Sequence, residues 1–284
     1  MGLINTSTLQ LEEFFGSSKP PYAILSHTWE KEEVLFADTA NLWRARAKAG
    51  FAKVKSTCAL AARQGYDYVW IDTCCIDKSS SSELSEAINS MFAWYQESRG
   101  SPVRPFSIQI QGTCPEETAP VGKTKIHSLC THIYSTLPRV EFYSASWDYL
   151  GEKKDPGFIS TLSTASRVEE VFLSGILPLE KVCVAKKMYW ASHRKTARLE
   201  DEAYCLMCLF QVNMPLLYGE RLNAFMRLQH EIVKKTHDMS ISAWYCDPSF
   251  DRNMRHDTRF LVGPVFARSP SIFRCSSNIA LRAT

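Results

Sequence analysis

Two short hydrophobic stretches, each followed at once by polar and sulfur-bearing residues, most constrain what this chain can fold into. Residues 22–29 read Y-A-I-L-S-H-T-W, and residues 68–78 read Y-V-W-I-D-T-C-C-I-D-K. Runs of this kind are typical of buried parallel strands, whose carboxyl ends deliver side chains to the rim of a sheet. The sequence therefore predicts two neighbouring parallel strands, 22–26 and 68–72, with their polar tips in one crevice.

The residues around these stretches predict helices that alternate with strands. Val54, Cys58 and Ala61 recur at helical spacing before Gly65, a suitable helix stop, and residues 80–83 have the spacing of a capping box that opens a second helix. This order predicts an α/β fold with a short parallel sheet flanked by helices. A further strand is expected at 140–143. Helices are expected at 179–191, 199–210 and 222–235, so that the C-terminal half should be mainly helical.

The pattern of turn residues predicts how the chain is organised. Residues 1–21 are interpreted as an N-terminal entry segment, residues 22–245 as the main domain and residues 246–284 as a C-terminal closing segment. Within the main domain, residues 99–138 are rich in glycine and proline and keep neither a helical nor a strand period. We expect an irregular insertion there.

Composition limits the classes of partner and the compartment. The 284 residues are 45% hydrophobic, enough for a substantial core, and 33 basic residues against 30 acidic ones give a net charge of +3. No nucleic-acid or membrane partner is expected from this balance. Because no signal peptide and no membrane-length apolar run is seen, we expect a cytoplasmic protein, and its ten scattered cysteines should be reduced thiols.

Motifs for phosphate and metal binding are incomplete. Gly122-Lys123-Thr124 resembles the end of a phosphate-binding loop, but Glu117 stands where its first glycine should be. Cys205 and Cys208 have zinc-ligand spacing, yet they lie within an apolar helical stripe and lack a second pair. We therefore expect no metal site and no bound cofactor.

The cysteine pair after the second strand allows two interpretations. In an extended segment Cys74 and Cys75 would point to opposite sides, so that only one of them could react. His27 could then serve as the base of a Cys–His catalytic pair. For the other cysteine, packing in the core is the favoured interpretation.

Polar residues at the strand ends form the predicted crevice. Asp72 and Glu86 are the candidate catalytic acids, because neighbouring carboxylates can shift one another's pKa. Asp77 could instead shape a turn, and a solvated helix face is the default interpretation for Glu86. Arg198 could bind a carboxylate or phosphate, although an internal ion pair is favoured. The candidate binding residues are Ser26, His27, Trp29, Cys74, Asp77 and Arg198.

Taken together, these residues resemble the fungal heterokaryon-incompatibility (HET) domain. The central match is residues 67–88, which read D-Y-V-W-I-D-T-C-C-I-D-K-S-S-S-S-E-L-S-E-A-I. Further matching segments are 22–29, 33–36, 50–54, 140–143, 198–204, 214–220, 224–229 and 267–273. Most of the chain is covered by the resemblance.

The resemblance implies a role in fungal non-self recognition, as a trigger or effector of regulated cell death that acts through self-assembly or protein partners. HET domains are similar in architecture to Toll/interleukin-receptor (TIR) domains of innate immunity, so the sheet should be TIR-like. Some TIR domains cleave NAD, which makes an NAD hydrolase, with NAD as substrate and Glu86 or Asp72 as its acid, the alternative function.

The chain departs from the family pattern between residues 98 and 137. Family members continue there with a short strand and then a segment whose glutamate matches the TIR catalytic acid, and neither is found in this stretch. Loss of the strand would expose a sheet edge. A diverged, inactive paralogue and a frame change or mis-spliced exon in the coding sequence are two further explanations, which sequencing of the transcript would distinguish.

Overall fold

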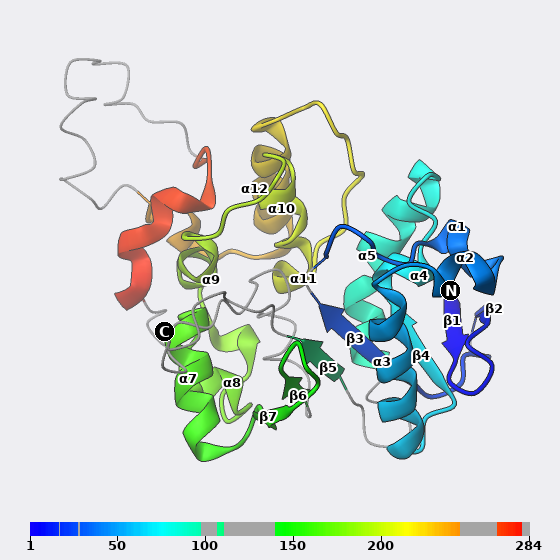
Figure 1. Ribbon diagram of the computed structural model, residues 1–284. Helices are drawn as coiled ribbons and strands as arrows, with labels where there is room; N and C mark the ends of the chain where they lie inside the picture. The colour runs from blue at the N-terminus through cyan, green and yellow to red at the C-terminus, as the bar shows by residue number, and fades with distance from the viewer. Residues whose placement is uncertain (17, 28, 98–106, 111–139, 245–265, 280–284) are drawn as a thin grey trace. The chain divides into compact units, whose positions relative to one another are not determined.

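The computed structural model describes residues 1–16, 18–27, 29–97, 107–110, 140–244 and 266–279 (Figure 1). The chain folds as two compact units, residues 1–176 and residues 177–284. The predicted irregular segment and most of the predicted closing segment, together with Gly122-Lys123-Thr124, lie largely or wholly outside the described residues.

The first unit is built on one mixed sheet. Among the described residues, seven strands run in the order β2-β1-β4-β3-β5-β6-β7. The four central strands are parallel, and the outer strands β1, β2 and β7 are antiparallel to their neighbours. The strands are β1 Gly2–Asn5, β2 Leu11–Glu13, β3 Tyr22–His27, β4 Tyr68–Ile71, β5 Ser107–Ile110, β6 Val140–Tyr143 and β7 Tyr149–Glu152.

The predicted pairing of the two hydrophobic stretches is confirmed. Strands β3 and β4 are parallel neighbours, with Ile24 opposite Trp70 and Leu25 opposite Ile71. The predicted α/β class is confirmed, since the first unit combines a sheet with helices. The sheet is not wholly parallel, because the N-terminal segment, which was expected only to lead into the domain, adds β1 and β2 at one edge.

Strand β5 corrects the expectation that residues 99–138 hold no regular structure. Residues Ser107–Ile110 pair in parallel with both β3 and β6, so the sheet edge that was expected to be exposed is covered. The four-residue strand lies in a stretch rich in proline and glycine, and its alternation of polar and apolar residues is too short to be recognised as a strand pattern in the sequence. Residues 98–106 and 111–139 on either side of it lie outside the described part.

The helices of the first unit follow the predicted strand and helix order. They are α1 Phe36–Thr39, α2 Leu42–Arg46, α3 Phe51–Arg63, α4 Asp72–Cys75, α5 Ser81–Glu97, α7 Pro156–Ser166 and α8 Glu170–Leu173. Helix α3 ends before Gly65, whose φ of +85° suits glycine, as the sequence predicted. In Figure 1, α3 lies in front of β4 and α5 lies behind it.

The predicted capping box at the start of α5 is present in a modified form. The Ser80 hydroxyl accepts a hydrogen bond from the backbone N–H of Glu83 at 3.3 Å. The Glu83 carboxylate accepts one from the backbone N–H of Asp77 at 3.0 Å, three residues before the expected donor. Satisfying these amides fixes both the helix start and the turn that leads into it.

The core between β4 and α5 is aromatic. Trp70 is 1% exposed and meets the rings of Trp94 and Tyr95 edge to face, with centroids 5.6 and 6.3 Å apart. Edge-to-face contacts add to the stabilisation that the burial of such large side chains provides. This packing holds the end of β4 in a fixed position beside β3.

The described elements of the second unit are all helical. They are α9 Val184–Ala191, α10 Asp201–Tyr204, α11 Met207–Phe210 and α12 Asn223–Lys235, with shorter 3-10 segments at Leu179–Lys181, Met239–Ser242 and Pro270–Asn278. The predicted helix at 179–191 is divided into the 3-10 segment Leu179–Lys181 and α9, and the predicted helix at 199–210 is divided into α10 and α11. The expected mainly helical C-terminal half is otherwise confirmed for the described residues.

A buried glutamine joins two distant segments of the second unit. The side chain of Gln229 on α12 donates a hydrogen bond to the carbonyl of Ala267 at 2.8 Å and accepts one from its backbone N–H at 2.9 Å. Both polar groups of Ala267 are thereby satisfied in the core, where an unpaired group would be costly.

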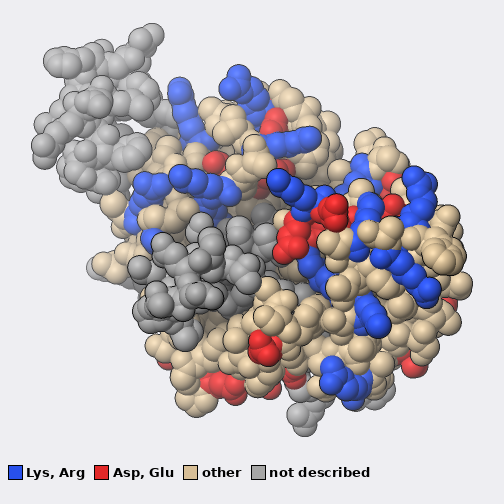
Figure 2. All heavy atoms as spheres, in the orientation of Figure 1, with Lys and Arg blue, Asp and Glu red and all other residues tan. Residues whose placement is uncertain are grey.

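Every helix in the described part of the chain is too short or too polar to cross a lipid bilayer. In Figure 2, Lys and Arg side chains predominate on the surface over α2 and α3, and a group of Asp and Glu side chains lies beside them.

Candidate functional site

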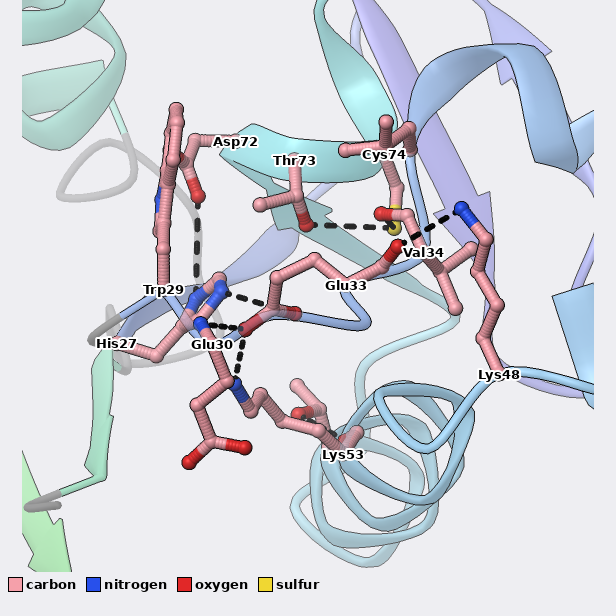
Figure 3. Close-up of polar contacts among 12 residues, drawn as sticks. His27, Trp29, Glu30, Glu33, Val34, Lys48, Lys53, Asp72, Thr73 and Cys74 are labelled. Atoms are coloured by element: carbon pink, nitrogen blue, oxygen red, sulfur yellow. Dashed lines mark hydrogen bonds and ion pairs between the residues drawn. The ribbon is translucent and has the colours of Figure 1, made fainter.

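The carboxyl ends of β3 and β4 bring the first predicted site residues together. The indole Nε1 of Trp29 donates a hydrogen bond to Oδ2 of Asp72 at 2.9 Å (Figure 3). Trp29 follows β3, and Asp72 is the first residue of α4 after β4. The two polar tips therefore meet at one rim of the sheet, as the parallel pairing predicted.

His27 lies at the centre of this rim and is fully buried. Its Nε2 is 3.6 Å from Oε2 of Glu33, its Nδ1 is 3.8 Å from Oδ1 of Asp72, and its side chain is 0% exposed. Neither ring nitrogen forms a hydrogen bond within the described residues. The imidazole thus lies between the carboxylates of Glu33 and Asp72.

Glu33 is the most deeply buried carboxylate of the rim, and sequence reasoning did not assign it to the site. Its Oε1 is 2.5 Å from Nζ of Lys53 on α3 and accepts a hydrogen bond from the backbone N–H of Glu30 at 2.9 Å. Burial alone would raise the pKa of Glu33, but the interactions with His27, Lys53 and the Glu30 amide outweigh it and lower the pKa to about 2. Glu33 is therefore ionised throughout the physiological range.

The segment that carries Glu33 is fixed from the side of α2 and α3. Lys48 donates a hydrogen bond to the carbonyl of Glu33 at 3.1 Å and also forms an ion pair with Asp38. Gly50 lies so close to this segment that a Cβ atom would be 2.7 Å from the carbonyl oxygen of Glu32. This close approach explains the glycine at the start of α3 and places Lys53 within reach of Glu33.

Lys78 completes the rim on the side of Asp72. Its Nζ lies 3.5 Å from Oδ2 of Asp72 and 3.4 Å from the centre of the Trp29 ring. Burial lowers the pKa of Lys78, and the nearby Asp72 carboxylate acts in the opposite direction. The rim thus contains two carboxylates, two ammonium groups and one imidazole, which largely neutralise one another.

The cysteines contradict the expected in-and-out arrangement. The chain becomes helical at Asp72, so Cys74 and Cys75 lie in α4 and both are buried. The Cys74 thiol donates a hydrogen bond to the carbonyl of Val34 at 3.2 Å, and burial raises the pKa of Cys58 and of Cys74 to about 12. A thiolate is therefore strongly disfavoured, and the structure supports core packing rather than a Cys–His nucleophile.

Asp77 and Ser26 serve the local structure of the rim. The Asp77 carboxylate accepts hydrogen bonds from the backbone N–H and the hydroxyl of Ser79 at 2.9 and 2.6 Å, which agrees with the turn-shaping alternative. Ser26 is 7% exposed within β3, where it lies opposite Gln109 of β5. Neither residue contacts the Asp72 carboxylate through the hydrogen bonds found in the described part of the chain.

The two remaining predicted site residues are Glu86 in the first unit and Arg198 in the second. Glu86 is exposed on α5, and within the described residues no hydrogen bond or ion pair joins it to His27 or Asp72. Arg198 belongs to the second unit, where its guanidinium lies 4.5 Å from the centre of the Tyr218 ring. Among the described residues Arg198 contacts this aromatic face, and the ion pair that the sequence favoured is not found there.

The family-like segments of the second unit form a separate structural network. Glu200 accepts hydrogen bonds from the backbone N–H groups of Gly219 and Arg221 at 2.8 and 2.9 Å. The backbone N–H of Glu200 itself and then these two N–H groups lower the pKa of its carboxyl. Tyr204 accepts a hydrogen bond from the N–H of Leu217 at 2.8 Å. The side chains of Glu200 and Tyr204 thus bind the backbone N–H groups of the segment that contains Leu217, Gly219 and Arg221.

Metal-binding clusters are not found in the described part of the chain, where no three His, Cys, Asp or Glu side chains are grouped in a suitable way. Cys205 lies in the break between α10 and α11, and Cys208 follows within α11. Burial raises the pKa of the Cys205 thiol, which disfavours the thiolate that a metal would need.

Comparison with known proteins agrees with this organisation. The family described as Heterokaryon incompatibility protein (HET) matches residues 22–103, the part that contains β3, α3, β4 and α5. Vegetative incompatibility protein HET-E-1 of Podospora anserina is 37% identical over 227 residues, which are 76% of this chain and 16% of that protein. The chain therefore spans only a small part of the length of this relative. No solved structure matches the chain. On these findings, the chain belongs to the heterokaryon-incompatibility (HET) family.

Proposed function

We propose that this chain is a trigger or effector of fungal non-self recognition, which promotes regulated cell death by self-assembly or by binding a protein partner in the cytoplasm. The relative in Podospora anserina is a vegetative incompatibility protein, which supports the biological role. The contacts that the rim side chains make with one another support the proposal that the domain acts by assembly. Asp72 binds Trp29 and Lys78, and Glu33 binds Lys53, so that these groups hold the surface in one conformation.

The proposal is tested by expressing the chain in a fungal host and measuring viability together with the size of the protein in the cell extract. We expect growth arrest and a high-molecular-weight species. Asp72→Asn should weaken both effects, because it removes the charge that Lys78 and His27 face. Glu30→Gln is the matched control, since the Glu30 side chain is exposed. A stable protein that leaves viability unchanged would contradict the proposal.

An NAD hydrolase of TIR-like architecture is the second candidate. One observation favours it. The Asp72 side chain remains 23% exposed at the carboxyl ends of parallel strands, where nucleotide sites form in open α/β sheets. Glu86 would act in the same reaction only if a bound substrate extended to the exposed face of α5. Incubating the purified protein with NAD at high protein concentration distinguishes the two functions. Nicotinamide release that is lost in Asp72→Asn supports hydrolysis, and killing without release supports assembly.

The inactive-paralogue and faulty-gene alternatives concern residues 98–137. A transcript that encodes these residues as written would remove the gene alternative. Growth arrest on expression would exclude the alternative that the chain is an inactive paralogue.

A further inference from the structure

An ammonium group of the protein itself occupies a cation site at the surface of the rim. Nζ of Lys78 lies 3.4 Å from the centre of the Trp29 ring and 3.5 Å from Oδ2 of Asp72. An aromatic face and a carboxylate are the two groups that attract a cation most strongly in proteins. We call the pair Trp29 and Asp72 the cation cradle.

The cradle does not depend on Lys78 for its shape. The indole N–H of Trp29 donates to the same Oδ2 of Asp72 at 2.9 Å, which fixes the ring relative to the carboxylate. Asp72 itself is anchored in the first turn of α4, with its Oδ1 3.8 Å from His27. Removal of the lysine side chain should therefore leave ring and carboxylate in place.

The ammonium group is not an optimal occupant. At 3.5 Å its contact with Asp72 is longer than the roughly 2.8 Å of a strong charge-assisted hydrogen bond. The Lys78 side chain is 26% exposed and is long enough to turn into solvent. Burial lowers the pKa of Lys78, which means that desolvation of its strongly hydrated ammonium opposes its placement there.

We propose that the cradle formed by Trp29 and Asp72 binds a weakly hydrated organic cation, a quaternary ammonium or an N-alkylpyridinium group, and that Lys78 is its built-in competitor. Such a cation keeps the attraction to the ring and the carboxylate but loses less hydration than a primary ammonium does. Trp29 is 55% exposed, so solvent reaches the ring from outside. The proposal is independent of the assembly role, because it concerns a ligand site on the isolated protein.

The test is a titration of the purified chain with N-methylpyridinium chloride, and with tetramethylammonium chloride in parallel, at constant total chloride. Binding is followed by the ¹H–¹⁵N signal of the Trp29 indole, which is assigned by its absence in Trp29→Leu. Lys78→Ala removes the competitor, and the dissociation constant should fall by about tenfold, the equivalent of roughly 1.4 kcal/mol. Lys31→Ala, at an exposed lysine, is the matched control and should leave the constant unchanged.

Three further variants make the result decisive. Lys78→Arg keeps a cation in the cradle and should bind the probes as weakly as the unmodified chain. Lys78→Gln offers a second uncharged variant if Lys78→Ala fails to show the native indole spectrum. Asp72→Asn, introduced together with Lys78→Ala, should reverse the gain. The proposal is overturned if the folded Lys78→Ala or Lys78→Gln variant shows no shift of the Trp29 signal up to about 20 mM probe. It is equally overturned if Trp29→Leu, in which binding is followed by the backbone ¹H–¹⁵N signal of Asp72 instead of the lost indole signal, still binds the probes.

Discussion

Replacement of Glu33 by glutamine should destabilise the first unit strongly at neutral pH. Glutamine keeps an oxygen for the Glu30 amide but removes the charge that faces Lys53 and His27. Both Glu33 and Lys53 are largely buried, with side chains 6% and 12% exposed, so water compensates little for the loss. A buried charge left without its partner is one of the few single changes that cost several kcal/mol.

The magnitude follows from the pKa of Glu33. Its fall from 4.5 to about 2 is a difference of about 2.5 in pKa, and at 1.36 kcal/mol for each pKa unit this is about 3 kcal/mol of stability at pH 7. Because the folded pKa is the lower one, the contribution is complete above pH 4.5 and is lost as the pH falls toward 2. At pH 3 we expect about 1.5 kcal/mol to remain.

The assay is urea unfolding at pH 7 and at pH 3, followed by far-ultraviolet circular dichroism. Glu33→Gln should lower the free energy of unfolding by about 3 kcal/mol at pH 7 and by about half as much at pH 3. Glu30→Gln, with its exposed side chain, is the control and should change it by less than about 0.5 kcal/mol at either pH. The reasoning is refuted if Glu33→Gln matches the control at pH 7, or if its effect is the same at both pH values.

Three further predictions concern packing, thiol reactivity and buried hydrogen bonds. Gly50→Ala should lower the free energy of unfolding, measured by thermal unfolding, by about 1–3 kcal/mol, because the new methyl would lie 2.7 Å from a backbone carbonyl oxygen. Gly157→Ala is the control and should be neutral or stabilising, because nothing lies within 4 Å of the new methyl. Equal effects of the two substitutions would rule out the steric argument. Iodoacetamide at pH 8 should modify the exposed Cys275 in the folded protein and Cys74 only after denaturation, and peptide mass mapping would identify the modified residues. Labelling of Cys74 in the folded protein would contradict its burial and its pKa of about 12. Gln229→Leu should lower the free energy of unfolding of the second unit, measured by chemical denaturation, by about 2–4 kcal/mol, because it leaves the buried N–H and carbonyl of Ala267 unpaired. A change below about 0.5 kcal/mol would show that these two groups find other partners.

Local signals in the sequence were sufficient for the elements that frame the site. The runs at Tyr22–His27 and Tyr68–Ile71 carry the composition of buried strands, and Ser80 with Glu83 carries the chemistry of a helix start. These features depend on residues within a few positions of one another. The parallel arrangement could be predicted because a helix between two strands returns the chain to the end of the sheet where the first strand began.

Other features could not be found by the same reasoning. Four residues of β5 alternate too briefly to be distinguished from the surrounding loop, and only pairing with β3 and β6 makes them a strand. Helix α4 begins directly at the end of β4, so the two cysteines were assigned to an extended segment although both lie inside the core. Tertiary contacts determine the conformation in each case.

The sequence by itself determined the α/β class, the adjacency of the first two central strands and the family, because each rests on local composition or on a long match of residues. Only the tertiary structure decided that Glu33, Lys53 and Lys78 join His27, Trp29 and Asp72 at one rim. These charged residues come from three different segments and look like ordinary surface residues in the sequence. Their effect on one another depends on distance and burial, which arise only when the chain has folded.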